Sequence, residues 1–286
     1  MNPKVASTIQ EELRKLLDVG FIYEIEHSDW VSPIVCVPKK NGKLRVCVDF
    51  KKLNAHTVKD HYPLPYTESI LERLAGHEAY SFLDGFSGYN QVKIAAADQH
   101  KTTFATEWGT YAYRVMPFGS CNAPGTFQRM MCHVFKDFLR KFLEIFMDDF
   151  CIYSNQEEHL DKLRMVLERC RLYLIEINPS KCHIMVSHGV VLGDIVSKRG
   201  IAVDPDKVRV IQTLEPPRTT KEVQIFMGHM NYYRRFIKGC VDMSRPIYGL
   251  IHNPEWTKEC EEAFHELKKG FYLGKGISCA YRCICL

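Results

Sequence analysis

The 286-residue sequence lacks a long hydrophobic run, and this absence excludes a simple membrane anchor. No apolar stretch approaches the ~18 residues that a membrane-spanning helix needs. The N-terminus, Met1-Asn2-Pro3-Lys4, shows no apolar targeting core and passes directly into a polar helical pattern. We therefore expect an intracellular protein that carries neither a secretion signal nor a transmembrane signal.

The chain also lacks a strong excess of charge of one sign. Its 38 Lys and Arg residues against 34 Asp and Glu residues leave a formal net charge of +4. This mildly basic balance permits a nucleic-acid partner without demanding one, because a local groove matters more than the total charge. Hydrophobic residues make up 46% and charged residues 25%, which is ordinary for a globular protein with a core.

Cysteine is plentiful, with 12 residues spread along the chain. Because no secretory signal precedes them, dispersed cysteines indicate a reducing compartment and free thiols. Cys279, Cys283 and Cys285 could be interpreted as a metal knuckle. They lack a nearby histidine and regular ligand spacing, so we favour unpaired cysteines in a tail.

Hydrophobic periodicity predicts a mixed sheet with helices, followed by a small helical unit. A first amphipathic helix carries Val5, Ile9 and Leu13 on one face and stops at Gly20. No internal repeat or low-complexity stretch interrupts the pattern. We predict further helices near residues 70–74, 123–139, 160–174, 204–211, 219–230 and 257–268, and strands near 80–84, 92–94, 101–106, 111–115 and, as a hairpin, 182–186 and 190–196.

A basic hairpin is predicted between residues 34 and 50. Residues 34–37 read as a strand, and residues 44–50 alternate between apolar and polar side chains. The Asn41-Gly42 pair is the favoured two-residue turn, since both residues tolerate positive φ. Arg45 points away from the apolar face, and the turn region is rich in lysine, with Lys39, Lys40 and Lys43.

A second hairpin carries adjacent aspartates, Asp148 and Asp149, at its tip. Asp is a favoured turn residue, so a pair of this kind is most often a solvated turn. Here the arms are apolar, with Phe146 before the pair and Phe150 after it, so we expect them to be packed. Two carboxylates held at the end of a packed hairpin repel each other unless a cation neutralises them.

Asp84, at the end of the strand predicted at residues 80–84, would supply a third carboxylate. Hard oxygen ligands suit Mg²⁺, which takes the rest of its coordination shell from water and substrate phosphates. Two such metal ions can activate an attacking hydroxyl and stabilise a leaving pyrophosphate. The sequence alone does not show that Asp84 and Asp148 meet in space.

Several motifs resemble those of reverse transcriptases of gypsy-type LTR retrotransposons. Residues 82–91 read FLDGFSGYNQ and resemble the family's first catalytic motif, and residues 146–149 read FMDD and resemble its aromatic-x-Asp-Asp box. Similar matches, in the family's order, are MPFG at 116–119, NAPGTFQR at 122–129, the fingers hairpin at 35–54, the primer-grip and thumb-entry residues at 192–193 and 200–204, and NYYRRFI at 231–237.

The resemblance implies a right-hand polymerase fold of the α+β class. Residues 1–200 would form fingers and palm, residues 201–245 a helical thumb, and residues 246–286 the start of a connection region with a divergent tail. It also implies two Mg²⁺ ions, with Mn²⁺ as a substitute. Their ligands would be Asp84, Asp148 and the carbonyl of Gly85, with Asp149 supporting the site.

The resemblance implies further binding roles. Lys39 and Arg45 would hold the triphosphate of the incoming nucleotide, although Lys39 by itself reads as a solvated loop lysine. Tyr89 would lie under the sugar and leave no room for a 2′-hydroxyl; by pattern alone it could equally be a core tyrosine. Phe118 and Gly119 would line the same pocket, and the primer grip would be Leu192 and Gly193.

The implied activity is RNA-directed DNA polymerisation, a nucleotidyl transfer from a deoxynucleoside triphosphate to a primer on an RNA or DNA template. The implied location is the cytoplasm, a virus-like particle or the nucleus. Because the sequence offers no strands for a ribonuclease H domain, we expect truncation before it and an RNA–DNA hybrid left intact. The alternative is a decayed retrotransposon remnant that only binds nucleic acid. It is motivated by Ser120, Gly125 and Asp194, where the family usually has leucine, alanine and histidine.

Overall fold

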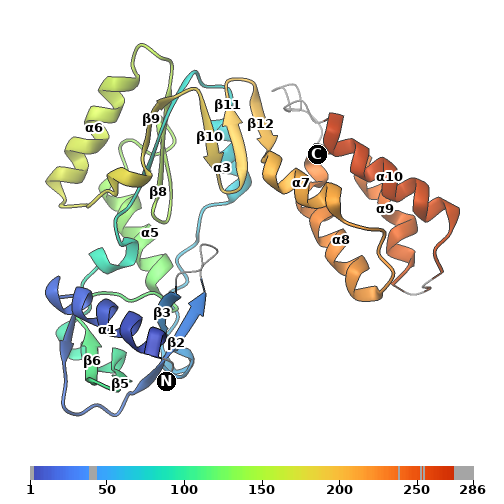
Figure 1. Cartoon of the computed structure of the whole chain (residues 1–286). Coiled ribbons are helices and arrows are strands. Elements are labelled where there is room, and N and C mark those ends of the chain that lie inside the picture. Colours follow the sequence, from blue (N-terminus) through green and yellow to red (C-terminus); the bar gives the residue numbers. More distant parts are fainter. Residues whose placement is uncertain (1–2, 39–43, 238, 252, 254, 274–286) are drawn as a thin grey trace. The chain divides into compact units, whose positions relative to one another are not determined.

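The computed structural model describes residues 3–38, 44–237, 239–251, 253 and 255–273 (Figure 1). The chain divides into two compact units, which we call the first and the second unit. The first unit comprises Met1–Pro65, Ser81–Ile152 and Leu160–His183, and the second comprises Tyr66–Tyr80, Tyr153–His159 and Ile184–Leu286. The domain boundaries predicted at residues 200 and 245 stay predictions.

The N-terminal part of the first unit is a five-stranded sheet covered by one helix. The strand order is β1-β6-β5-β2-β3, and β2 and β3 form the predicted antiparallel hairpin. Pro38 pairs with Leu44, and the two-residue turn predicted at Asn41-Gly42 lies outside the described residues. Helix α1 buries Ile9 and Leu13 against Phe104 and Tyr111 of the sheet, as its apolar stripe predicts. The bounds are α1 Pro3–Asp18, β1 Ile22–Glu24, β2 Ser32–Pro38, β3 Leu44–Val48, β5 Phe104–Thr106 and β6 Gly109–Tyr113.

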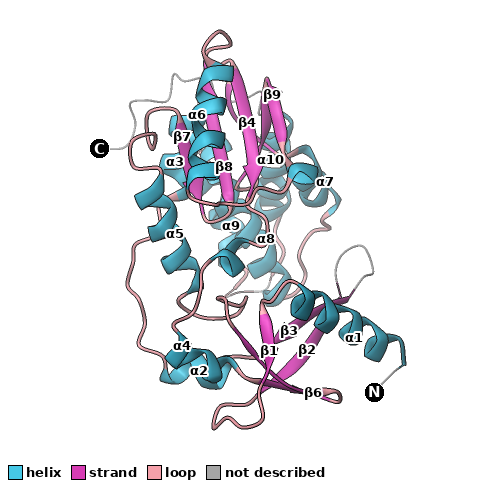
Figure 2. Ribbon diagram, turned by 90° about the vertical axis from the view of Figure 1, so that its left-hand side faces the viewer, coloured by secondary structure: helices cyan, strands magenta, loops and turns pink. Residues whose placement is uncertain are grey.

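The candidate site lies on a four-stranded sheet in the order β7-β8-β4-β9. Helix α6 runs alongside β8 and β4 (Figure 2), and α5 and α6 pack on a cluster that includes Phe127, Phe150 and Val166. These side chains are almost completely buried, which is the main source of stability for such a layer. The bounds are β4 Ala79–Asp84, β7 Leu143–Phe146, β8 Asp149–Ser154, β9 His183–Val186, α5 Ala123–Val134 and α6 His159–Leu172.

The second unit contains a three-stranded sheet, order β10-β11-β12, and a helical core. Phe226, Met230, Phe264 and Leu267 form the centre of this core. Helix α8 begins with the capping box that Thr219 and Glu222 predict. The bounds are α3 Thr67–Leu74, β10 His188–Val191, β11 Asp194–Ser197, β12 Gly200–Val203, α7 Pro205–Thr213, α8 Thr220–Tyr233, η4 Arg234–Phe236, α9 Cys240–Gly249 and α10 Lys258–Leu273.

Short helical turns complete the described residues. Their bounds are α2 Lys51–His56, η1 Gly88–Gln91, α4 Ala96–Gln99, η2 His100–Thr102 and η3 Pro179–Lys181. No helix in the described part of the chain has the length and apolar character needed to cross a membrane. The nine cysteines that the structure describes are free thiols, and the three cysteines from 279 onwards lie outside the described residues.

Three sequence predictions in the first unit are wrong in detail. The strand expected at 92–94 is reduced to a single bridge between Lys93 and Val115. The strand expected from residue 101 begins only at Phe104, because residues 100–102 form a 3-10 turn. Helix α5 ends at Val134 instead of near 139, because the chain must reverse into β7 and Arg140 adopts a φ of 63° to do so.

The hairpin expected between 182–186 and 190–196 is also wrong. Residues 188–191 pair with 194–197, so the turn falls at Leu192 and Gly193. Strand β9 instead belongs to the four-stranded sheet, beside β4. A period-two pattern does not reveal which strands pair, and that is why the prediction failed. Helix α9 was not predicted; it contains Pro246, a residue that usually breaks a helix.

Candidate active site

The turn between β7 and β8 holds the first candidate carboxylates. Phe146 pairs with Asp149, so Met147 and Asp148 form a two-residue turn and Asp149 is the first residue of β8. Met147 has a φ of 55°, a region that is costly for a residue with a side chain. A turn with this geometry usually carries glycine there, so other contacts must hold Met147 in place.

Gln128, on α5, supplies those contacts. Its side chain is completely buried, and its Nε2 donates to the carbonyl of Ile145 at 3.0 Å. Its Oε1 accepts from the backbone N–H of Met147 at 2.7 Å. One amide side chain therefore satisfies an acceptor in β7 and a donor in the turn that follows it. Gln128 belongs to a predicted motif, but no role was predicted for it. The signal that could have indicated this role is a glutamine on the apolar side of a helix.

The structure brings Asp84 and Asp148 together. Gly85, which follows Asp84, donates its backbone N–H to the carbonyl of Asp148 at 2.8 Å. A Cβ atom built on Gly85 would lie 3.5 Å from the Cβ of Asp148, and one on Gly88 would lie 3.5 Å from its Oδ2. Both glycines therefore lie within van der Waals range of the Asp148 side chain. The end of β4 therefore lies directly beside the turn after β7.

The three aspartates influence each other electrostatically. Partial desolvation, together with the negative charges of Asp148 and Asp84, raises the pKa of the Asp149 carboxyl to about 6, and the positive charge of Lys181 opposes this shift. Asp149 as a whole residue remains exposed, so its carboxyl is crowded by like charges but still reachable from solvent. A cluster of repelling carboxylates of this kind is stabilised by a bound cation.

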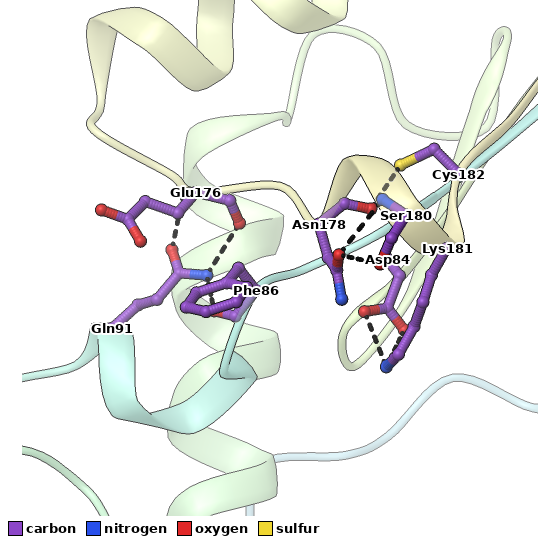
Figure 3. A network of polar contacts seen from close by, with 8 residues as sticks. All are labelled: Asp84, Phe86, Gln91, Glu176, Asn178, Ser180, Lys181 and Cys182. Atoms are coloured by element: carbon purple, nitrogen blue, oxygen red, sulfur yellow. Dashed lines mark hydrogen bonds and ion pairs between the residues drawn. The ribbon is translucent and has the colours of Figure 1, made fainter. Parts of the chain in front are cut away.

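Lys181, at the end of η3, is a residue of this cluster that the sequence analysis missed. Its ammonium nitrogen lies 3.1 Å from both carboxylate oxygens of Asp84 (Figure 3). The Asp84 side chain is 20% exposed, so the pair is partly shielded from solvent. Neither spacing nor periodicity could signal this contact, because the two residues are 97 positions apart.

A network of backbone contacts fixes the segment after Asp84 (Figure 3). The Gln91 Nε2 donates to the carbonyls of Phe86 at 2.7 Å and Glu176 at 3.0 Å, and its Oε1 accepts from the Glu176 N–H at 3.0 Å. The carbonyl of Asp84 itself accepts from the N–H of Asn178 at 2.8 Å. The carbonyl of Asp84 and the segment that follows it are therefore anchored by the segment that leads to Lys181.

The donor set suits a hard divalent cation that shares its ligands with a substrate. Asp84, Asp148 and Asp149 offer only oxygen atoms, which Mg²⁺ and Mn²⁺ prefer. Within the described residues, no group of three or more His, Cys, Asp or Glu side chains is arranged to hold a metal ion. A site of this type fits Mg²⁺, because that ion retains waters and binds substrate phosphates in place of a full protein cage.

An aromatic cluster lies next to the carboxylates. The Tyr89 ring lies 5.0 Å from the Phe118 ring and 5.8 Å from the Phe127 ring, and its hydroxyl donates to the Met147 sulfur at 3.4 Å. Burial raises the pKa of Tyr89, and the negative charge of Asp148 adds to this shift. The structure therefore places Tyr89 beside both the aspartate turn and Phe118, which is 56% exposed.

Gly119 and Arg45 are the other described nucleotide-pocket candidates. Gly119 has a φ of 96°, and its carbonyl accepts from Nδ2 of Asn54 at 2.7 Å. A Cβ atom on Gly119 would lie 3.4 Å from the carbonyl oxygen of Val48 on β3. Arg45 lies exposed on the same strand, opposite Val37. Lys39 lies outside the described residues, and its triphosphate role stays a prediction.

Leu192 and Gly193, the primer-grip candidates, form the turn between β10 and β11 in the second unit. The departure from the family pattern at Gly125 is sterically mild, because a Cβ atom there would meet Tyr62 at an ordinary 3.6 Å. Asp194 does not present its charge at the surface, since its side chain is 1% exposed and paired with Arg235.

Solved structures show which class of protein has this fold. The chain is similar to the foamy viral protease-reverse transcriptase in complex with dsDNA, with a TM-score of 0.89 and 24% identity over 97% of this chain and 59% of that one. A second structure, the same kind of protein in complex with an RNA/DNA hybrid, gives a TM-score of 0.83 and 23% identity, and covers 97% and 38% of the two chains. The fold is thus the α+β polymerase fold of reverse transcriptases.

Residues 37–229 match the family described as "Reverse transcriptase (RNA-dependent DNA polymerase)", and the chain belongs to this family. It is 34% identical over 270 residues to the retrovirus-related Pol polyprotein from transposon 412 of Drosophila melanogaster, covering 91% of this chain and 22% of that protein. It is 29% identical over 271 residues to the transposon Tf2-3 polyprotein of Schizosaccharomyces pombe, covering 93% and 20%. The chain thus spans about a fifth of these relatives, which confirm its resemblance to retrotransposon reverse transcriptases.

Proposed function

We propose that this chain is an RNA-directed DNA polymerase that adds deoxynucleotides to a primer 3′-hydroxyl. Its partners would be an RNA template, a DNA primer–template duplex and deoxynucleoside triphosphates, and its cofactor would be Mg²⁺ or Mn²⁺. The convergence of Asp84 and Asp148 through the Gly85 N–H at 2.8 Å carries this proposal. That contact unites two acidic motifs that are far apart in the sequence, in a chain that belongs to the reverse transcriptase family.

Asp84, Asp148 and the carbonyl of Gly85 would hold the metal ions, and Asp149 would support them. When bound, two divalent ions would lower the pKa of the primer hydroxyl and neutralise charge on the phosphates. The residues of the chain then contribute chiefly by positioning and by fixed electrostatics. The Gln128 contacts keep the aspartate turn in one geometry, and the Gln91 contacts do the same for the segment after Asp84.

Nucleotide selection would fall to the aromatic cluster and to the basic hairpin. Tyr89, held between Phe118, Phe127 and Met147, would fill the space that a 2′-hydroxyl needs. Arg45 would bind the triphosphate as a forked donor and Lys39 as a point charge. In this proposal residues 1–200 act as fingers and palm, residues 201–245 as thumb, and the following residues as the start of a connection region.

Primer extension by the Asp148→Asn variant tests the proposal. The substitution keeps the shape of the side chain and removes a ligand charge, so extension with Mg²⁺ should fall by at least about 10³-fold, as for loss of an essential charge-stabilising group. Asp161→Asn is a matched control, because Asp161 is 78% exposed on α6 and pairs only with the nearby Arg164. Equal rates for wild-type protein and Asp148→Asn would refute the assignment. A wild-type chain that binds duplex without extending it would support the decayed remnant.

A further inference from the structure

The turn between β10 and β11 has an unfavourable backbone geometry. Val191 pairs with Asp194, so Leu192 and Gly193 form a two-residue turn in which both have positive φ, 51° and 92°. Glycine adopts such angles freely, but leucine does so at a steric cost. Turns of this kind usually carry Asn or Gly in the first position. Leu192 therefore needs tertiary contacts to hold it in this conformation.

Three side chains from the helical part of the same unit provide those contacts. The Tyr232 hydroxyl donates to the carbonyl of Leu192 at 3.2 Å, and the Lys207 ammonium donates to the carbonyl of Gly193 at 3.1 Å. Arg235 forms an ion pair with Asp194. The Lys207 nitrogen also lies 5.7 Å from the centre of the Tyr232 ring, so these two contacts support each other. We call Lys207, Tyr232 and Arg235 the grip clamp.

Asp194 is the buried partner of the grip clamp. Its side chain is 1% exposed, and its buried Oδ1 has no hydrogen-bond partner among the described residues. Burial raises the pKa of the carboxyl, whereas the positive charges of Arg235 and Lys207 lower it. A buried carboxylate without a partner is strongly unfavourable, so the ionised form depends on these two cations.

The clamp also changes what the turn presents to a ligand. The carbonyl oxygens of Leu192 and Gly193 both accept hydrogen bonds from within the protein, and the Asp194 charge is buried against Arg235. The negative ends of these groups are therefore directed inward and neutralised. A surface of this kind suits the phosphate backbone of a nucleic acid, which two open carbonyls and a free carboxylate would repel.

We propose that Lys207, Tyr232 and Arg235 are positioning residues that hold Leu192 and Gly193 in one geometry against the primer strand, with the Arg235–Asp194 pair as the anchor. This proposal rests on the polymerase function proposed above. The clamp explains how a buried aspartate is tolerated at position 194. Arg235 acts through Asp194 and not by direct contact with the nucleic acid.

A double-mutant cycle tests this inference. Arg235→Met leaves the Asp194 carboxylate buried and unpaired, so the turn should rearrange. Dissociation of a labelled primer–template duplex into a trap should then accelerate by roughly ten- to a hundredfold, the usual effect of a small misplacement of a binding group. Hydrogen exchange of the amides of residues 188–197 should accelerate as well. Asp194→Asn combined with Arg235→Met should restore most of both properties, because no buried charge remains.

Arg234→Met is the matched control, since Arg234 is the adjacent exposed arginine and its loss changes the net charge equally. It should leave hydrogen exchange at the turn unchanged. Equally fast dissociation from Arg235→Met and from the double variant would show that Arg235 contacts the nucleic acid directly, and would overturn the clamp. If Arg235→Met does not fold, Lys207→Met removes the bond to the Gly193 carbonyl, the contact with the Tyr232 ring and a positive charge near Asp194. Unchanged exchange at the turn in that variant would also overturn the clamp.

These readouts separate the clamp from the proposed polymerase function. A wild-type chain that binds duplex but does not extend primers would refute the proposed polymerase function. Duplex dissociation and amide exchange in the variants would still test the role of the clamp. A chain that does not bind duplex at all would overturn both. A general loss of structure would lower the melting temperature and raise the apparent KM for nucleotide as well. A positioning role predicts faster duplex dissociation with an unchanged KM for nucleotide.

Discussion

The Lys181 ammonium lies 3.1 Å from each carboxylate oxygen of Asp84, so a lysine neutralises the aspartate that is expected to bind metal. A cation bound by Asp84 must share or displace this contact, because both require the same lone pairs. Lys181 is thus a counter-charge for the acidic cluster, and it would compete with a metal ion that binds Asp84.

We expect Lys181→Gln to bind Mn²⁺ several-fold more tightly than the wild-type chain, an effect of about 1 kcal/mol that is typical of a partly exposed ion pair. The reason is that the ammonium no longer competes for Asp84. Mn²⁺ titration by calorimetry or electron paramagnetic resonance measures this directly. Lys181→Arg keeps the charge and should retain wild-type affinity. Weaker or unchanged binding by Lys181→Gln would contradict the competition.

Gln128→Leu should loosen the aspartate turn. The substitution removes the hydrogen bonds to Ile145 and Met147, and it leaves a carbonyl and an N–H group without their partners. We expect the free energy of unfolding to fall by about 2–4 kcal/mol, as for two unsatisfied groups at a partly buried site. Primer extension should fall by more than the loss of folded protein explains. Chemical denaturation and primer-extension assays on the same preparation measure the loss of stability and the loss of activity. Extension at the wild-type rate would show that the aspartate turn keeps its geometry without Gln128.

The raised pKa of Asp149, about 6, predicts an unusual pH dependence for the metal-free chain. A carboxyl whose folded-state pKa exceeds its unfolded value binds protons preferentially in the folded state. The contribution of Asp149 therefore makes the chain more stable as the pH falls from about 6 to about 4. The same protonation should weaken Mg²⁺ binding below pH 6.

Asp149→Asn isolates this contribution, because the variant cannot titrate at that position. The difference in unfolding free energy between wild-type protein and Asp149→Asn should change over the window from pH 4 to 6 and remain flat above it. Denaturation curves at several pH values without metal provide the measurement. A constant difference across this window would show that Asp149 titrates at its ordinary pKa.

Tyr89→Val should weaken the discrimination against ribonucleotides. Removing the ring opens space beside Phe118 and Phe127, where a 2′-hydroxyl could be accommodated. We expect the ratio of deoxyribonucleotide to ribonucleotide incorporation to fall by at least about tenfold, since a steric pocket contributes selectivity of that order. Tyr89→Phe loses only the contact with the Met147 sulfur and should remain selective. Single-nucleotide kinetics with both sugars decide the matter, and equal selectivity in all three proteins would exclude Tyr89 as the gate.

The sequence by itself determined the local elements and the family. Apolar stripes predicted α1 and α10, the capping residues Thr219 and Glu222 predicted the start of α8, and alternation predicted the β2–β3 hairpin. Each of these signals lies within a few residues of the element it predicts. The acidic and aromatic motifs, in their order along the chain, indicated the family, and the match of residues 37–229 to the reverse transcriptase family confirms it.

Only the tertiary structure decided which of these residues meet. The contacts of Asp84 with Lys181 and of Gln128 with Met147 join residues that are 97 and 19 positions apart. The pairing of residues 188–191 with 194–197, and the burial of Asp194 against Arg235, likewise depend on how strands and helices pack. A local sequence pattern indicates the face of the helix or strand on which a side chain lies. It does not indicate which residue packs against that face, because long-range packing decides this. Buried charges and buried hydrogen-bonding groups need partners, and those partners come from distant parts of the sequence.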